Sequence, residues 1–247
     1  MSSCLLIGPP GSGKTTAACT APGPVGVIDF DYKLHKMDNI KHLLQNGQVI
    51  QIPINQPLSM MGLRRLATAK HETAKDLVQQ RPQGYLDFVD VMEALEKDCT
   101  WGGVKLKTVV IDSYTSLQEH LKRMIMAANS KSSMTLPLYG VLLSNLEEVN
   151  NTLVRMPINV IVVAHEKADK NELIGNITYK AMVEGQMADK IGKDFEEIYF
   201  MQKVISGDGA KATAKYEMMT LGDSMRSART SHNLPAIVEP DFSKIFK

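Results

Sequence analysis

Residues 8–15 constrain this chain more than any other stretch of its sequence. They read GPPGSGKT and match the P-loop pattern G-x-x-x-x-G-K-[ST] at every position. The short apolar run at residues 3–7 precedes the motif as a buried strand would, and residues 15–19 can continue as a helix. Because the motif requires this strand–loop–helix context, the sequence predicts a phosphate-binding loop within an α/β fold.

The residues of this loop suit the phosphates of a nucleotide. Glycines let backbone N–H groups turn inward around phosphate oxygens, and a helix that begins near Gly13 adds its positive end. Lys14 would reach the β- and γ-phosphates, and the Thr15 hydroxyl would bind Mg²⁺. The alternative is a turn rich in glycine and proline that holds no ligand. We predict ATP and Mg²⁺ as cofactors, and the predicted nucleotide-binding residues are Gly8, Pro9, Pro10, Gly11, Ser12, Gly13, Lys14, Thr15 and Thr16.

Composition places the chain among soluble globular proteins of one domain, residues 1–247. Hydrophobic residues make up 44% of the 247 residues and charged residues 22%. The net charge of +1 argues against a protein that coats duplex DNA, so a nucleic-acid site would have to be a local patch. Three scattered cysteines indicate a reducing compartment, and the apolar N-terminal run is too short for a signal peptide or membrane span. We expect a cytoplasmic protein, in the host cytoplasm if a phage encodes it, with no membrane partner.

Acidic residues follow two further apolar strands. Asp112 ends the run 107–113 and is the expected partner of the P-loop in the Mg²⁺ shell, although a helix N-cap is an alternative role. Asp29 and Asp31 end the run 25–31, and either could orient or deprotonate the water that attacks the γ-phosphate. The alternative is a pair of solvated loop acids, and the sequence does not decide which of the two acts.

The remaining pattern predicts a mostly parallel central sheet flanked by helices, with late antiparallel strands near the C-terminus. His165 directly follows a near-continuous apolar strand at 157–164, where a polar side chain could sense the γ-phosphate, although most lone histidines are structural. Residues 165–177 read as a polar loop. Further strands are predicted at 48–54, 195–205 and 212–221, and helices at 33–47, 63–80, 84–97, 114–129, 139–155 and 185–193.

These motifs, in this order and spacing, resemble the RecA-like P-loop ATPases. The resemblance rests on the P-loop and on the runs VIDFD, VVIDS and VVAH, and it covers most of the chain. It extends to compact phage ATPases of the RecA/RadA-like single-strand annealing class. It implies that Asp31 activates water, with Asp where glutamate is usual, and that the γ-phosphate sensor is His165 or, with a shift of one residue, Glu166.

The resemblance also implies single-stranded DNA as a partner. DNA-binding loops of the family correspond to residues 129–136 and 166–179, where acidic residues offset several of the cations. The candidate DNA-binding residues are Lys131, Lys167, Lys170 and Lys180. Related ATPases insert a basic finger into the active site of a neighbouring subunit. Arg229 is the first candidate for this finger and Arg226 the second. The alternative is that both are ordinary surface charges. We therefore expect a homo-oligomer, ring or filament, with a single-strand-binding protein as a further candidate partner.

The predicted activity is hydrolysis of ATP to ADP and phosphate, stimulated by DNA, in recombination or annealing. Two alternatives remain open. A small-molecule phosphotransferase would use the same loop, but the sequence has no arginine-rich lid. A binding module that uses ATP as an assembly switch would turn over little nucleotide.

Overall fold

The computed structural model describes residues 1–54, 83–170, 175–207 and 212–246. The predicted helix at 63–80 lies outside these residues. The strands are β1 (Ser3–Gly8), β2 (Val25–Asp29), β3 (Val49–Pro53), β4 (Thr100–Trp101), β5 (Val104–Lys105), β6 (Thr108–Asp112), β7 (Asn159–Lys170), β8 (Ile177–Ala181), β9 (Glu197–Ser206), β10 (Thr213–Met219) and β11 (Ile237–Val238). The helices are α1 (Lys14–Ala18), α2 (Lys41–Gln45), α5 (Gln83–Asp98), α6 (Tyr114–Ala128), α7 (Leu136–Arg155) and α8 (Met187–Lys190), with 3₁₀ turns at Leu34–Lys36, Asp38–Ile40, Ile191–Lys193 and Phe242–Lys244.

A twisted sheet forms the centre of the molecule and follows the predicted class. Its order is β11-β10-β9-β1-β7-β6-β2-β3, and the pairs from β9 to β3 are parallel. Strands β10 and β11 continue it in antiparallel fashion, which confirms the late antiparallel strands. Strand β7 separates the P-loop strand β1 from β6, so the interposed strand comes from sequence that follows Asp112.

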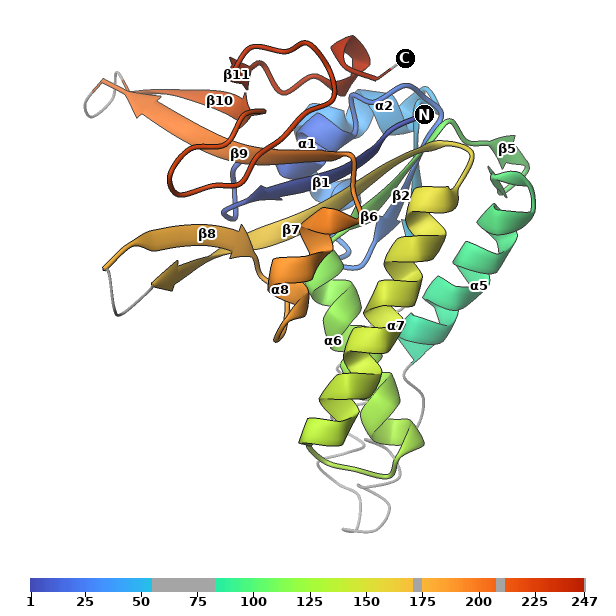
Figure 1. Ribbon diagram of the computed structural model, residues 1–247. Coiled ribbons are helices and arrows are strands. Elements are labelled where there is room, and N and C mark those ends of the chain that lie inside the picture. The colour runs from blue at the N-terminus through green and yellow to red at the C-terminus, as the bar shows by residue number, and fades with distance from the viewer. Residues whose placement is uncertain (55–82, 171–174, 208–211, 247) are drawn as a thin grey trace.

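Helices cover both faces of this sheet because its central strands are apolar on both sides. All six residues of β1 are buried, and alternate residues contribute to two separate cores. Leu5 and Ile7 pack with residues of α5, α6 and α7, which Figure 1 shows along one face. Cys4 and Leu6 pack with α1 and with Phe242 near the C-terminus on the other face. None of the helices within the described residues combines the length and apolar character that a membrane span requires.

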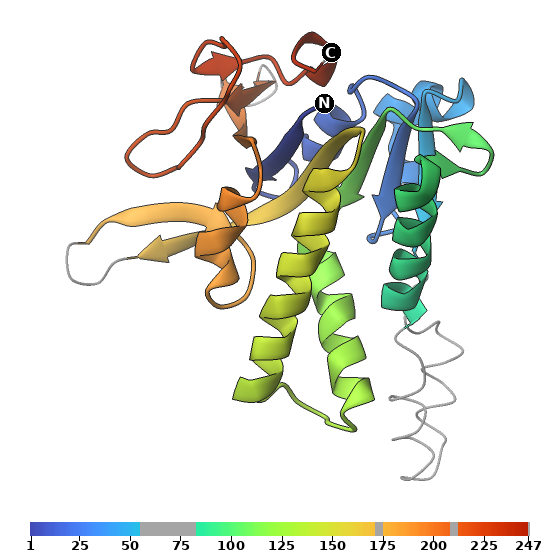
Figure 2. The ribbon, with the colours of Figure 1, turned by 45° about the vertical axis from the view of Figure 1, so that its right-hand side comes forward.

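The stretch after His165 is a hairpin, and the expected polar loop at 165–177 is therefore wrong for most of its length. Strand β7 continues to Lys170 and pairs with β8 in antiparallel register, with Ala168 opposite Tyr179. Figures 1 and 2 show this hairpin projecting from the body of the sheet. Residues 168–170 are exposed, so backbone pairing rather than core packing holds the strand, and the hydrophobic pattern gave no sign of it.

The hairpin of β9 and β10 lies against the P-loop. A Cβ atom added to Gly8 would lie 2.5 Å from the backbone oxygen of Met201 on β9. A Cβ atom added to Gly13 would lie 3.0 Å from the ring of Tyr216 on β10. The loop therefore needs glycine at position 8 because the β9 backbone leaves no room for a side chain, whereas Gly13 is required by its φ of 86° as well as by the nearby ring.

Candidate nucleotide-hydrolysis site

The P-loop connects β1 to α1 and has the backbone that the motif requires. Gly11 and Gly13 have φ angles of 75° and 86°, a region that favours glycine. Helix α1 begins at Lys14, directly after the loop. The Ser12 hydroxyl is buried and has no hydrogen-bond partner among the described residues. An unpartnered buried hydroxyl inside this loop fits a ligand oxygen.

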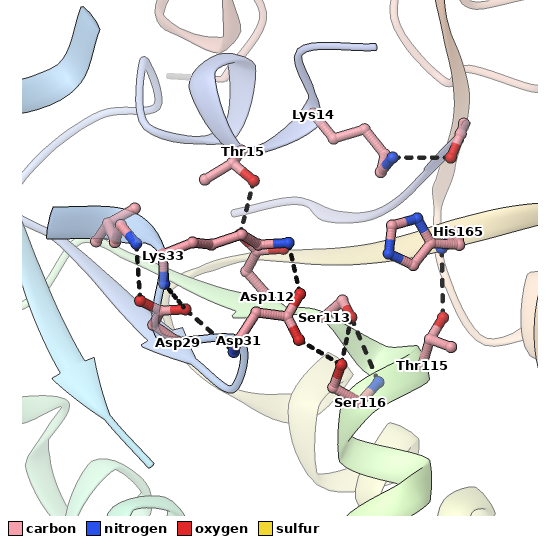
Figure 3. A network of polar contacts seen from close by, with 12 residues as sticks. Lys14, Thr15, Asp29, Asp31, Lys33, Asp112, Ser113, Thr115, Ser116 and His165 are labelled. Atoms are coloured by element: carbon pink, nitrogen blue, oxygen red, sulfur yellow. Dashed lines mark hydrogen bonds and ion pairs between the residues drawn. The ribbon is translucent and has the colours of Figure 1, made fainter. Parts of the chain in front are cut away.

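Lys14 lies folded across its own loop. Its Nζ donates hydrogen bonds to the carbonyl oxygens of Gly8 and Pro9, each 2.8 Å long (Figure 3). Burial, with a smaller contribution from the positive charge of Lys33, lowers the pKa of Lys14 to about 8, although Asp112 opposes the shift. A phosphate would supply stronger acceptors than the two carbonyl groups and would favour the charged lysine.

Thr15, at the start of α1, lies beside Asp112, at the carboxyl end of β6. The Thr15 hydroxyl donates to Asp112 Oδ2 over 2.7 Å, and Asp112 is 2% exposed. Burial raises the pKa of Asp112, although the Thr15 hydrogen bond and the Lys33 charge partly offset this effect. The N-cap of α6 is Ser113, whose side chain accepts a hydrogen bond from the backbone of Ser116. The alternative role of Asp112 as a helix cap is therefore wrong.

The oxygen donors of Thr15 and Asp112 fit Mg²⁺. Within the described residues, no group of three or more His, Cys, Asp or Glu side chains could hold a metal by itself. Mg²⁺ characteristically takes one or two protein oxygens and fills its shell with water and substrate phosphates. The site fits this coordination preference, because the Thr15 hydroxyl and the Asp112 carboxylate lie beside a phosphate-binding loop.

Asp29 and Asp31 have different roles, which the sequence left open. The Asp29 carboxylate is fully buried, and its Oδ1 accepts hydrogen bonds from the backbone N–H groups of Asp31 and Lys33. Its Oδ2 accepts from the backbone N–H of Leu34 and from the side chain of Gln51. With all its donors inside the chain, Asp29 holds the turn that follows β2.

The Asp31 carboxylate lies between Lys33 and Ser116 (Figure 3). Its Oδ1 accepts a hydrogen bond of 2.5 Å from the Ser116 hydroxyl at the start of α6, and its Oδ2 lies 2.5 Å from Lys33 Nζ. Burial alone would raise the pKa of Asp31, but these two contacts outweigh burial and lower it. The carboxylate is 24% exposed and therefore stays accessible to water. Asp31 is the better placed of the two acids to act on an attacking water.

His165 lies beside the P-loop because β1 and β7 pair in register. Gly8 is opposite His165, whose backbone N–H donates to the Thr115 hydroxyl over 3.4 Å. Burial lowers the pKa of His165, and the charges of Lys14 and Lys33 lower it further. Its Nδ1 is buried and has no partner among the described residues. An imidazole with an unpartnered nitrogen at this position fits a sensor of bound phosphate.

The comparison with protein families decides where this chain belongs. The model of a family described as AAA domain matches residues 2–231. The chain belongs to this AAA domain family. A search of the curated proteins finds no match for the AAA domain described here.

The solved structures that match this AAA domain share little sequence with it. An ATPase from the type III secretion system of pathogenic bacteria is 11% identical, with a TM-score of 0.49 over 81% of this chain. This chain spans 52% of that ATPase. The flagellar accessory protein FlaH of Methanocaldococcus jannaschii is 12% identical over 96% of this chain and 83% of its own, with a TM-score of 0.42. A KaiC-like protein of Pyrococcus horikoshii OT3 is 14% identical over 96% and 88%, with a TM-score of 0.46.

The two finger candidates of this AAA domain are engaged within their own chain. The Arg226 guanidinium lies over the ring of Tyr179, 4.5 Å from its centroid, and its Nε is 4.0 Å from Glu166 Oε2. Arg229 donates from Nη2 to the carbonyl oxygens of Gly192 and Phe195. To reach a neighbouring subunit, Arg229 would have to give up both carbonyl groups.

The four DNA-binding candidates do not form one patch. Lys131 is exposed in the turn between α6 and α7, at the end of this helical pair away from the sheet, whereas the other three lie on the β7–β8 hairpin (Figure 1). Lys170 is exposed, and Lys167 donates to a backbone carbonyl over 3.4 Å. Lys180 forms ion pairs of 2.8 and 2.7 Å with Asp169 and with the aspartate at position 189. The positive charge of Lys180 is therefore neutralised locally.

Sequence reasoning missed two residues of the site, Lys33 and Ser116. Both contact the Asp31 carboxylate, Lys33 from the turn after β2 and Ser116 from the first turn of α6. Lys33 could have been noticed, because a cation two residues after the candidate base is within reach of it. Ser116 had no such signal, because its contact depends on the pairing of β2 with β6.

Proposed function

We propose that this AAA domain hydrolyses Mg²⁺-bound ATP to ADP and phosphate and uses that cycle on single-stranded DNA during recombination or annealing. The observation that carries the proposal is the convergence of Lys14, the Thr15–Asp112 pair and Asp31 at one edge of the sheet (Figure 3). Each of these side chains matches one requirement of phosphoryl transfer to water.

The roles follow from where the side chains lie. Lys14 binds the terminal phosphates, and Thr15 and Asp112 hold Mg²⁺, which neutralises charge on the phosphate oxygens when it is bound. Asp31 orients the attacking water and accepts its proton, while His165 reports the γ-phosphate to β7. His165 belongs to the strand that continues into the β7–β8 hairpin, so a shift of this side chain reaches the hairpin without an intervening loop.

The projecting hairpin is the support for DNA as the partner. It begins next to the sensor position and carries Lys167, Lys170 and Tyr179, whose ring stacks with Arg226 from the segment that follows β10. Aromatic and cationic side chains of this kind bind the bases and backbone of single strands. Lys180 is engaged by ion pairs, so Lys167 and Lys170 supply the contacts with the DNA backbone in this proposal.

Phosphate release measured with and without single-stranded DNA tests the proposal. We expect Mg²⁺-dependent release from ATP that rises when DNA is present. Phosphate transferred to a nucleoside would instead support a phosphotransferase, and tight ATP binding without release would support an assembly switch. Either result would contradict the proposed hydrolysis.

A set of lysine variants tests the DNA site. We expect the triple alanine variant of Lys131, Lys167 and Lys170 to bind single strands more weakly and with a smaller salt dependence. The matched control replaces three exposed lysines around the β4–β5 hairpin, and these are Lys97, Lys105 and Lys107. Equal affinity of the two triple variants would place DNA elsewhere.

We further propose that a second copy of the chain completes the site, with Arg229 as the first finger candidate and Arg226 as the second. A finger of this kind contributes ~10³-fold or more in rate. Arg229→Ala should bind ATP and fail to hydrolyse it, and mixing it with Lys14→Ala should restore part of the activity at shared interfaces. Full activity of Arg229→Ala, or a specific rate independent of protein concentration, would contradict shared sites.

A further inference from the structure

Lys33 is a charged side chain at the centre of the site to which the P-loop motif assigns no role. Figure 3 shows it extending from the turn after β2 toward the Thr15–Asp112 pair, where its Nζ meets Asp31. Its charge acts on the groups around it, because it lowers the pKa of Lys14 and His165 and favours the ionised form of Asp112. Lys33 therefore lies among the groups that would surround the γ-phosphate.

The backbone and the side chain of Lys33 have separate contacts. Its N–H donates to the buried Asp29 carboxylate, which fixes the turn, whereas its ammonium contacts Asp31. The Lys33 side chain is 42% exposed, and ion pairs of such exposure contribute little to stability. The ammonium can therefore move from Asp31 to another anion at little cost, while the turn that carries it stays in place.

The charges of the site change when ATP arrives. Without nucleotide, Lys33 and the Ser116 hydroxyl both hold the Asp31 carboxylate. A base held by an ammonium is a poor proton acceptor, because the contact favours the ionised carboxylate. A γ-phosphate beside Lys14 offers Lys33 a second, more highly charged partner. Competition between the carboxylate and the phosphate for one ammonium then links the presence of ATP to the freedom of the base.

We propose that Lys33 is a catalytic residue of ATP hydrolysis within its own chain. When ATP binds, the Lys33 ammonium moves from Asp31 to the γ-phosphate, and Asp31 is then free to accept a proton. The inference rests on the proposed ATPase function. As the water oxygen bonds to the γ-phosphorus, the bond from phosphorus to the β–γ bridging oxygen breaks. The electron pair stays on the β-phosphate of ADP, and the water proton goes to Asp31. Lys33 neutralises charge on the γ-phosphate oxygens throughout.

This role predicts that Lys33 distinguishes ATP from ADP. ADP lacks the γ-phosphate, so Lys33 remains on Asp31 and adds nothing to ADP affinity. A ligand with a γ-phosphate gains one charge-assisted contact, which is equivalent to roughly 10-fold or more in affinity. The ratio of the two affinities therefore reports the contact independently of turnover.

The experiment compares Lys33→Met, Lys33→Arg and the control Lys36→Met. Lys36 is exposed in the same turn region, and its side chain has no role in the site. Turnover is measured by phosphate release, and binding by calorimetry with Mg²⁺-ADP and with the non-hydrolysable analogue Mg²⁺-AMP-PNP. Thermal unfolding of each variant checks the fold, which we expect to persist because Asp29 binds the backbone of Lys33 rather than its side chain.

We expect Lys33→Met to lose ~10²-fold in turnover, as when one charge-stabilising donor is removed, and to bind AMP-PNP roughly 10-fold more weakly. Its ADP affinity should stay within about twofold, Lys33→Arg should recover part of the AMP-PNP affinity, and Lys36→Met should behave as wild type. Retained turnover in Lys33→Met, or an equal loss of affinity for ADP and for AMP-PNP, would overturn the role of Lys33 but not the proposed ATPase function. A wild-type chain that releases no phosphate from ATP would overturn the proposed function and the inference with it.

Discussion

Replacing Asp29 by asparagine should destabilise the fold, although the two side chains have nearly the same shape. Each Asp29 oxygen accepts two hydrogen bonds, at 3.2 and 3.4 Å on Oδ1 and at 3.0 and 2.8 Å on Oδ2. Asparagine has one oxygen and one NH₂ group. Whichever way the amide is turned, its NH₂ group faces at least one backbone N–H donor, so at least one hydrogen bond is lost and donor opposes donor.

The size of the effect follows from this count. A hydrogen bond to a charged group contributes about 1.5–3 kcal/mol, and some of these contacts are only partly buried, so we expect a loss of about 2–4 kcal/mol. At roughly 2–4 °C for each kcal/mol in a chain of this length, the unfolding temperature should fall by roughly 5–15 °C. Asp31→Asn is the matched control, because Asp31 is partly exposed and its ion pair contributes about 0–1 kcal/mol.

Urea denaturation measures the free energy of unfolding for both variants, and phosphate release measures their turnover. We expect Asp29→Asn to lose stability and Asp31→Asn to keep its stability, bind ATP and lose ~10²-fold or more in turnover. An Asp29→Asn variant within about 0.5 kcal/mol of wild type, the range of ordinary surface changes, would refute the structural role of Asp29.

Two further predictions concern the metal and pH. Asp112→Asn should reduce Mg²⁺-dependent ATP binding by ~10-fold or more, because an amide attracts the metal shell less than a carboxylate does. ATP titrations at several Mg²⁺ concentrations check this prediction. An unchanged Mg²⁺ requirement would contradict it. His120 packs against Phe30, and burial lowers its pKa below the usual value of 6.5. The unfolded chain therefore binds the proton more tightly than the folded chain, and stability falls as the pH drops below about 6.5. Urea unfolding at pH 7.5 and 5.5 should show a smaller loss for His120→Leu than for wild type, and an equal loss would show that other groups carry the acid sensitivity.

The parallel sheet could be predicted because its central strands are recognisable in the sequence as apolar runs. Strands β1, β2, β6 and the buried part of β7 are apolar runs that end at Gly8, Asp29, Asp112 and His165, and the structure brings all four ends to one edge. Parallel strands place their carboxyl ends together, so position in the sequence was enough to predict the edge.

The contacts at that edge could not be predicted in the same way. Asp29 and Asp31 share residue type and strand end, and only the three-dimensional course of the following turn separates a buried anchor from an accessible base. Arg229 matched a finger position, yet its hydrogen bonds to carbonyl groups of its own chain depend on the folding of distant segments. The β7–β8 hairpin escaped notice because an exposed strand has no alternating apolar pattern.

Phosphate release by purified wild-type protein and Lys14→Ala, at saturating Mg²⁺-ATP, tests the central claim most directly. Within the described residues, the Lys14 side chain donates its hydrogen bonds to carbonyl oxygens of its own loop, so the variant should fold, and its unfolding temperature provides the check. We predict Mg²⁺-dependent release by the wild type and background release by Lys14→Ala, because the charge that binds the terminal phosphates is gone. Equal release by the two proteins would contradict ATP hydrolysis at this P-loop.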